Sequence, residues 1–316
     1  MQLSDLGEFG LIHKFSRLLS KPKNVLLGIG DDAAAILPLS KHHLILLTCD
    51  PVIEGIHFDK TAAPYQIGWK AMTRNLSDIA AMGGIPRYAL VAASLPPHIS
   101  VLCAIEIYRG LKAAAQKFGA IIVGGDTSHN LYGIHVTVTI VGEVARSELV
   151  SRANARVDDI LYVTGTLGGS RYGKHLKFKP RIHEGRFLAQ HFHPSAMIDV
   201  SDGLASDLQR LVQQSGVGFE IWSDSLPISS TLLSRKLSPK QQFQHAIEDG
   251  EDYELLFTVS SKHRTSLEMA WKKCFRLPLT QIGMVRPKRF GIRFIGKMGI
   301  HKIPSSAKVP NDHFRI

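Results

Sequence analysis

Cysteine is scarce in this sequence, and its placement excludes two kinds of architecture. The 316 residues contain three cysteines, Cys49, Cys103 and Cys274, which lie far apart and form no CxxC pair. Disulfide-stapled domains and zinc sites need several cysteines at close spacing, so neither is expected. Cys103 and Cys274 are expected to be small apolar residues of the interior.

Long apolar runs are missing as well. No stretch reaches the roughly 20 apolar residues that a helix needs to cross a bilayer. The first residues, MQLSDLGEFGLIHKF, carry early acids instead of the basic and then apolar pattern of a secretory signal. The composition, 44% hydrophobic and 21% charged, is that of an ordinary globular chain and argues against extensive disorder. We therefore expect a cytoplasmic protein with no membrane partner.

Two common nucleotide-binding motifs are also absent. The sequence has neither GxxxxGK followed by Ser or Thr nor a GxGxxG after a predicted strand. Glycine clusters do occur, at 28–30, 124–125 and 165–169. Glycine lacks a Cβ and tolerates positive φ, so these turns allow the backbone to approach a ligand closely. If the chain binds nucleotide phosphates, it does so without a P-loop.

The chain has an excess of basic residues, which gives a formal net charge of +11. The excess is concentrated in two stretches, 171–186 and 286–302. Such a surplus can attract nucleic acids or small polyanions, but it is also common on solvated faces. We find no interleaved aromatic pattern of the kind that single-strand binders use. No nucleic-acid partner is expected.

Hydrophobic periodicity predicts helices and strands in both halves of the chain. Helices are predicted at 8–19, 69–82, 100–118, 203–215 and 261–275. Strands are predicted at 44–48, 120–123, 135–144, 160–165, 217–222, 253–259, 280–285 and 290–296. The mixture indicates an α/β or α+β fold in two halves. We place the N-terminal domain at 1–148 and the C-terminal domain at 149–316.

Acidic residues stand where the predicted elements begin or end. They are Asp31, Asp32, Asp50, Asp78, Asp126, Asp199, Asp202, Glu251, Asp252 and Glu254. Some have ordinary structural explanations, such as Asp202 as a helix N-cap or Asp50, before Pro51, as a turn residue. Asp78 is harder to explain in this way, because its apolar neighbours predict a buried position. A lone buried carboxylate is costly and needs a cation.

Carboxylates repel phosphates, so these acids cannot hold a nucleotide directly. They can hold it through Mg²⁺, a hard cation that takes oxygen ligands from a few carboxylates and from substrate phosphates. Acids beside glycine turns therefore favour phosphoryl transfer assisted by several metal ions.

Seven short segments occur in the order in which they are found in thiamine-monophosphate kinases. They are GIGDDAA, CDPVIEGIHF, NLSDIAAMGG, IVGGDT, VTGTLGGS, IDVSDGL and GEDYEL. From about residue 7 to the C-terminal NDHF, the chain resembles this family, which belongs to the superfamily of aminoimidazole ribonucleotide synthetase. The resemblance implies a two-domain α/β fold and a homodimer whose interface is the sheet of the N-terminal domain. It also implies a reaction in which ATP and thiamine monophosphate give ADP and thiamine diphosphate.

The resemblance implies roles for individual residues. The metal ligands would be Asp32, Thr48, Asp50, Asp78, Asp126, Asp199 and Asp202, with Cys49 contributing only a backbone carbonyl because a thiol is a poor ligand for Mg²⁺. ATP would contact Tyr108, Gly125, Asp126, Arg152 and Ser201, and thiamine monophosphate would contact His57 and Glu251. Taken alone, these last two residues and Arg152 could have purely structural roles. No catalytic base is implied, because the phosphate acceptor, with a second pKa of roughly 6, is already ionised.

Three departures from the family pattern concern the substrate side. Gly169 stands where the family carries an acid, the segment from Ser170 to His175 is short, and Asn311 replaces an aromatic residue that stacks against the substrate. We expect them to affect acceptor affinity more than phosphoryl transfer. Two alternatives stay open: another ATP-dependent enzyme of the superfamily with a different acceptor, and a catalytically inactive protein that binds nucleotide or nucleic acid.

Overall fold

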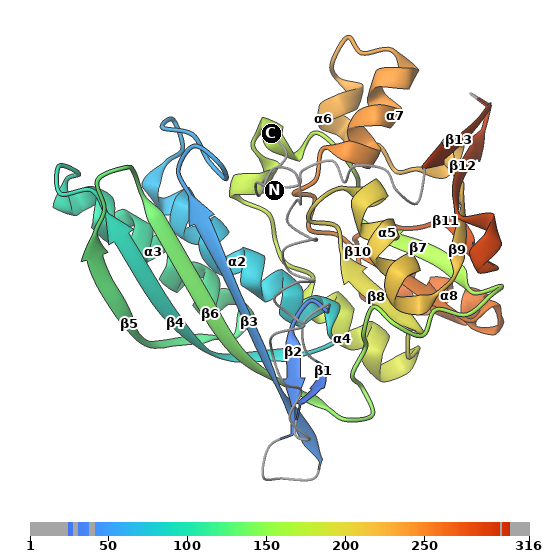
Figure 1. Ribbon diagram of the computed structural model, residues 1–316, viewed down its shortest axis with the longest axis horizontal. Coiled ribbons are helices and arrows are strands. Elements are labelled where there is room, and N and C mark those ends of the chain that lie inside the picture. Colours follow the sequence, from blue (N-terminus) through green and yellow to red (C-terminus); the bar gives the residue numbers. More distant parts are fainter. Residues whose placement is uncertain (1–24, 28–30, 38–41, 298, 304–316) are drawn as a thin grey trace, which may run out of the picture.

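The chain folds into two sheet-containing halves that lie side by side (Figure 1). The computed structural model describes residues 25–27, 31–37, 42–297 and 299–303. The predicted helix at 8–19, the first glycine cluster and Asn311 lie outside the described residues. The described part contains no helix that is both long and apolar enough to cross a membrane.

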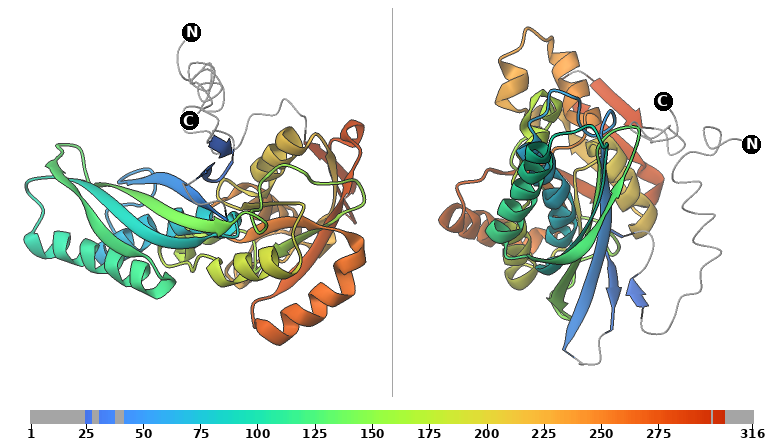
Figure 2. Two further views of the ribbon diagram at one scale, coloured as in Figure 1. Left: turned by 90° about the horizontal axis from the view of Figure 1, so that it is seen from below. Right: turned by 90° about the vertical axis from the view of Figure 1, so that its left-hand side faces the viewer.

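The first sheet has six strands in the order β1-β2-β3-β6-β4-β5. They are β1 (Val25–Leu27), β2 (Ala34–Ile36), β3 (His43–Ile53), β4 (Ile85–Leu95), β5 (Ile121–His129) and β6 (His135–Ala145). All neighbours are antiparallel except β4 and β5. Along β3 and β6, alternate residues are buried, as expected for a sheet that packs on one face. Helices α2 (Pro64–Ala81) and α3 (Val101–Phe118) cover that face and leave the other open (Figures 1 and 2).

Glycine allows α2 and α3 to pack with their backbones in contact. A Cβ on Gly68 would lie 1.8 Å from the Ile107 carbonyl oxygen, and one on Gly110 would lie 1.9 Å from that of Tyr65. The prediction began α2 at residue 69, five residues too late. The helix begins at Pro64, because proline is preorganised for the first turn of a helix.

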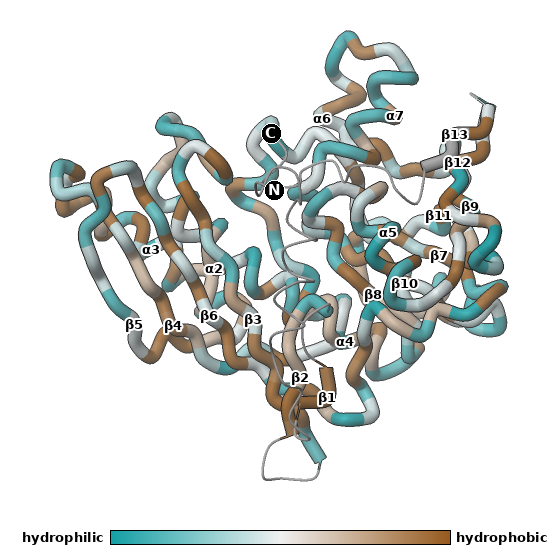
Figure 3. Tube along the Cα trace, in the orientation of Figure 1, coloured by the Kyte–Doolittle hydropathy of each residue, from teal (hydrophilic) through white to brown (hydrophobic). Residues whose placement is uncertain are grey.

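The second sheet has seven strands in the order β13-β12-β9-β11-β7-β10-β8. They are β7 (Ile160–Thr164), β8 (Ala196–Asp199), β9 (Gly218–Trp222), β10 (Leu255–Val259), β11 (Leu279–Arg286), β12 (Ile292–Gly296) and β13 (Gly299–Ile303). One face packs on α5 (Leu204–Ser215) and α7 (Pro239–Glu248), and the other packs on α4 (Ile182–His191) and α8 (Arg264–Cys274). A one-turn helix, α6 (Ser230–Leu233), precedes α7. The hydropathy of the trace shows apolar residues along many of the strands and polar residues in many of the loops (Figure 3).

The two halves share a continuous core. The larger apolar cluster joins α2 to α4, β7 and α8, and a Cβ on Gly185 of α4 would lie 2.2 Å from the Ala80 carbonyl oxygen of α2. The predicted two-domain α/β fold is confirmed, whereas the boundary at 148/149 stays a prediction. One expectation is wrong: Cys274 is exposed, since it ends the surface helix α8, and Cys103 is only partly buried.

Candidate active site

Three aspartates from distant parts of the chain meet where the two halves join. Asp32 precedes β2, Asp78 lies in the last turn of α2, and Asp199 ends β8. One carboxylate oxygen from each lies within 4.8 Å of the others. The predicted ligands Asp32, Asp78 and Asp199 are therefore brought together by the fold.

Neighbouring side chains fix the orientation of each carboxylate. Thr48 Oγ1 donates a hydrogen bond to Asp78, and Ser77 Oγ donates to Asp199 at 2.6 Å. Arg152 donates to Asp32 through two parallel bonds, from Nε at 2.9 Å and from Nη2 at 2.8 Å.

The electrostatics of this cluster favour a bound cation. Burial, reinforced by the charges of neighbouring aspartates, raises the pKa of Asp78 and the pKa of Asp199 well above the ordinary value. Burial and the charge of Asp32 also raise the pKa of Asp31 to about 6. A set of converging carboxylate oxygens without sulfur or imidazole is the donor set that suits Mg²⁺. The residues present fit this ion.

Strand β3 contributes side chains to both faces of its sheet. Thr48 and Asp50 point toward α2, where the Asp50 amide donates to Asn75 Oδ1 at 2.9 Å. Cys49 points to the open face, where Thr139 Oγ1 donates to its sulfur at 3.2 Å. The Cys49 side chain is thus turned away from the aspartate cluster.

Asp126 and Gly125 do not join the cluster within one chain. Register pairs Asp126 with Ala92, Ala92 with Thr137, and Thr137 with Pro51, so β5 lies three strands from β3. At about 4.8 Å per strand, this separation is roughly 14 Å. Residues paired across strands share a face, so Asp126 lies on the open face with Cys49.

Gly125 and Tyr108, two further predicted nucleotide contacts, lie on β5 and α3. Gly125 is packed so tightly that a Cβ would lie 1.8 Å from the Val91 carbonyl oxygen, which explains the glycine. Tyr108 is 52% exposed on α3.

Asp202 and Ser201 lie at the start of α5, in a turn organised by Asp207. Asp207 Oδ2 accepts hydrogen bonds from the amides of Ser201 at 3.1 Å and Asp202 at 3.2 Å. Arg210 pairs with both Asp202 and Asp207. The alternative role of Asp202 as the helix N-cap is wrong: Gly203 occupies that position, and no side-chain hydrogen bond caps the helix.

The predicted acceptor residues are joined by a lysine that the sequence analysis missed. Lys70 is fully buried, and its Nζ lies 2.5 Å from the His57 carbonyl oxygen, 2.8 Å from His175 Nδ1 and 2.6 Å from Glu251 Oε1. Burial lowers the pKa of Lys70 to about 8 although Glu251 opposes the shift. Burial would raise the pKa of Glu251, but a hydrogen bond from His175 and the charge of Lys70 lower it to about 2. The pair is therefore ionic at neutral pH.

A signal for this lysine exists in the sequence. Lys70, Arg74 and Asp78 recur every four residues, which places them on one face of the predicted helix. The spacing alone predicts no role for Lys70, because the sequence does not show what this face of the helix packs against.

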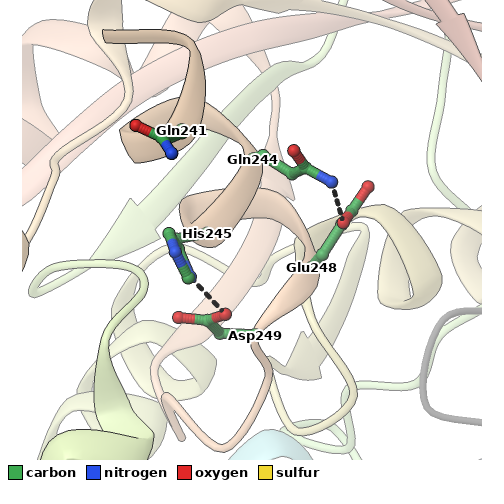
Figure 4. A pocket seen from close by; sticks show the side chains of 5 residues that line it. All are labelled: Gln241, Gln244, His245, Glu248 and Asp249. Carbon is green, nitrogen blue, oxygen red and sulfur yellow. Dashed lines mark hydrogen bonds and ion pairs between the residues drawn. The ribbon is translucent and has the colours of Figure 1, made fainter. Parts of the chain in front are cut away.

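A separate shallow pocket lies along α7 (Figure 4). It is lined by Gln241, Gln244, His245, Glu248 and Asp249. His245 Nδ1 lies 2.8 Å from Asp249, and Gln244 donates to Glu248 at 3.0 Å. Asp249 also accepts a hydrogen bond from the Gly169 amide at 2.8 Å, so these groups stabilise the turn at 168–169.

Comparison with known proteins finds a matching family domain for each half of the chain. The AIR synthase related protein family matches with its N-terminal domain at residues 30–144 and its C-terminal domain at 135–287. The thiamine-monophosphate kinase of Bacillus subtilis is 36% identical over an alignment of 309 positions, which covers 90% of this chain and 92% of that protein. The chain belongs to the thiamine-monophosphate kinase family.

Other members of the thiamine-monophosphate kinase family agree in sequence and in fold. The Aquifex aeolicus enzyme is 38% identical over 82% of this chain and 87% of its own length. A solved chain described as AaThiL complexed with AMPPCP and TMP has a TM-score of 0.82 and 33% identity, over 96% of this chain and 97% of that chain. The predicted family and the enzyme class are confirmed.

Proposed function

We propose that this protein transfers the γ-phosphoryl group of ATP to the phosphate of thiamine monophosphate. An acceptor phosphate oxygen forms a bond to the γ-phosphorus while the bond from that phosphorus to the β-phosphate oxygen breaks, which yields thiamine diphosphate and ADP. The observation that carries the proposal is the convergence of Asp32, Asp78 and Asp199 at the junction of the two halves. The names of the homologous enzymes support the choice of acceptor.

The chemistry needs positioning more than acid–base catalysis. The second pKa of a phosphate monoester is roughly 6, so the attacking oxygen is already ionised near neutral pH. The obstacle is the repulsion between two polyanions, which is about 4 kcal/mol for unit charges at 4 Å and an effective dielectric of about 20. Several bound Mg²⁺ ions would reduce this repulsion and align the reacting oxygens.

The chain's own residues divide between the two substrates. Asp32, Asp50, Asp78 and Asp199, supported by Thr48, would hold the ions, and Asp202 would join them from the start of α5. Arg152 and Ser201 would contact the nucleotide, as would Tyr108, Gly125 and Asp126. His57 and Glu251, held together by Lys70, would bind the thiamine side, and Asn311 would border it.

A homodimer would complete the nucleotide side. The open face of the first sheet carries exposed apolar side chains, namely Tyr88, Leu90, Ile121 and Val123, which are 46–61% exposed. A contiguous apolar surface of this kind marks an interface. Stacking two such faces about a two-fold axis would place Asp126 of one chain against the open face of the other, which carries Cys49. The cytoplasm, where ATP is available, is the proposed location.

The deciding experiment is a direct assay with ATP, Mg²⁺ and thiamine monophosphate. We expect thiamine diphosphate and ADP in equal amounts, and loss of both products when EDTA removes the ions. A parallel panel should contain thiamine and other phosphate acceptors. Turnover of a different acceptor in preference to thiamine monophosphate would overturn the proposed substrate, and ATP binding without any ADP would overturn the activity.

A further inference from the structure

Three charged side chains form a row on α2 that faces the second half of the protein. Lys70, Arg74 and Asp78 are spaced by four residues, so each lies about 6 Å along the helix from the next. Asp78 belongs to the aspartate cluster, and Lys70 binds Glu251. Arg74 therefore lies between the cluster and the residues assigned to the acceptor.

One edge of the Arg74 guanidinium is only partly satisfied by the described residues. Nη1 donates to the Pro51 carbonyl oxygen at 2.8 Å. Nη2 lies 3.4 Å from Asp50 Oδ2, which is long for a charge-assisted hydrogen bond. Nε is buried and has no hydrogen-bond partner among the described residues. The edge formed by Nε and Nη2 is the one that binds two oxygens of a phosphate side by side.

The surroundings of Arg74 explain why a cation is retained there. Burial opposes the charge, but Tyr253, Asp50 and Glu251 hold the pKa of Arg74 above its usual value. A buried donor without a partner is destabilising, and a ligand that accepts its hydrogen bond would remove that cost.

We propose that Arg74 binds the phosphate of the acceptor and thereby selects a phosphorylated acceptor over the corresponding alcohol. This inference rests on the proposed function, which places the acceptor between Glu251 and the aspartate cluster. A guanidinium at this point offers two parallel hydrogen bonds to the phosphate. Lysine could offer only a point charge. Arg74 is thus a specificity-determining residue for the reaction.

The test compares Arg74→Met and Arg74→Lys with the wild type, with Arg264→Met as a control at an exposed position on α8. Calorimetry in Mg²⁺ and AMPPCP gives the dissociation constants of thiamine monophosphate and thiamine. We expect Arg74→Met to raise the dissociation constant of thiamine monophosphate by between about 10- and 100-fold. The dissociation constant of thiamine should stay within about 2-fold of the wild-type value. Arg74→Lys should lose part of the preference for thiamine monophosphate over thiamine. Equal losses for both ligands, or none, would overturn the proposal.

Two further measurements keep the result decisive. If the melting curve shows that Arg74→Met does not fold, Arg74→Lys is compared with the wild type instead. The proposal then requires that Arg74→Lys loses more affinity for thiamine monophosphate than for thiamine. If the wild type makes no thiamine diphosphate, the proposed function fails, and titration with inorganic phosphate decides the role of Arg74. Weaker phosphate binding by the variants then supports that role, and unchanged binding overturns it.

Discussion

Arg152 binds Asp32 through both arms of its guanidinium, with Nε 2.9 Å from Oδ2 and Nη2 2.8 Å from Oδ1. The Asp32 side chain is fully buried. The arginine lies between the last strand of the first sheet and the first strand of the second, and the aspartate precedes β2, so the pair fixes the connection between the two sheets to the aspartate cluster. The guanidinium supplies the positive charge that a metal ion would otherwise provide to this carboxylate.

Replacing Arg152 should therefore make stability depend on divalent ions. We expect Arg152→Met to lower the free energy of unfolding by about 3 kcal/mol in EDTA, because the buried Asp32 carboxylate loses its partner. Adding Mg²⁺ should recover more stability in the variant than in the wild type. Urea unfolding with and without Mg²⁺ measures this, and an Asp32→Asn/Arg152→Met double variant should show a smaller loss. Equal responses to Mg²⁺ in all three proteins would contradict the prediction.

Removing a cluster carboxylate should abolish turnover and leave the fold intact. Asp78→Asn removes a buried charge that burial and neighbouring aspartates already disfavour, so stability in EDTA should be unchanged or higher. The turnover number should fall by at least about 100-fold, and Mg²⁺ should no longer raise the melting temperature as it does for the wild type. The control is Asp158→Asn, whose side chain is 73% exposed. Near-wild-type turnover of Asp78→Asn would exclude Asp78 as a ligand.

The buried Lys70–Glu251 ion pair should contribute to the stability of the folded chain. Lys70→Met leaves the Glu251 carboxylate buried without its main counter-charge, and a loss of about 3 kcal/mol is expected. Adding Glu251→Gln should cost less than the sum of the two single changes by at least about 1 kcal/mol. Urea denaturation of the four proteins at pH 7 gives this coupling. Strictly additive effects would show that the contact does not contribute.

Deprotonation of the buried Asp252 carboxyl group should lower the free energy of unfolding as the pH rises through the mildly acidic range. Burial raises its pKa to about 6 from the usual 3.8, despite the charge of Lys174 and hydrogen bonds from Ser170 Oγ at 2.5 Å and the Gly168 amide at 2.9 Å. The native state holds the proton more tightly than the unfolded chain, so this contribution is full below about pH 4 and is lost through pH 6. Between pH 5 and pH 7, the wild type should lose about 1 kcal/mol relative to Asp252→Asn. Urea unfolding at both pH values tests the sign, and a gain for the wild type would contradict it.

Local pattern was enough to predict much of the fold. The alternation of HVTVTIVGEV gave β6, and apolar spacing gave most of α2 and α3, because these signals come from neighbouring residues. β4 was missed, since its Pro86 and small alanines do not resemble a strand. β3 was predicted only to residue 48, but it continues through Pro51. Beyond Leu47, β3 pairs only with β6, and this half-open edge tolerates a proline.

The site shows where sequence reasoning ends. The acids of the cluster were identified because their segments resemble a known family. The roles of Lys70 and Arg74 depend on what α2 packs against, which no local pattern contains. The position of Asp126 depends on strand order and on a register shift between Ala89 and Leu90. Such pairings are long-range, so neither could be predicted from spacing.

The distance between β3 and β5 has a genetic consequence. If each active site takes Asp50 from one chain and Asp126 from its partner, two different inactive variants can repair each other. In a randomly mixed population of Asp50→Asn and Asp126→Asn chains, half the dimers would be hybrids, and each hybrid would rebuild one of its two sites. Such a mixture would recover about a quarter of the wild-type activity, although neither variant alone has any.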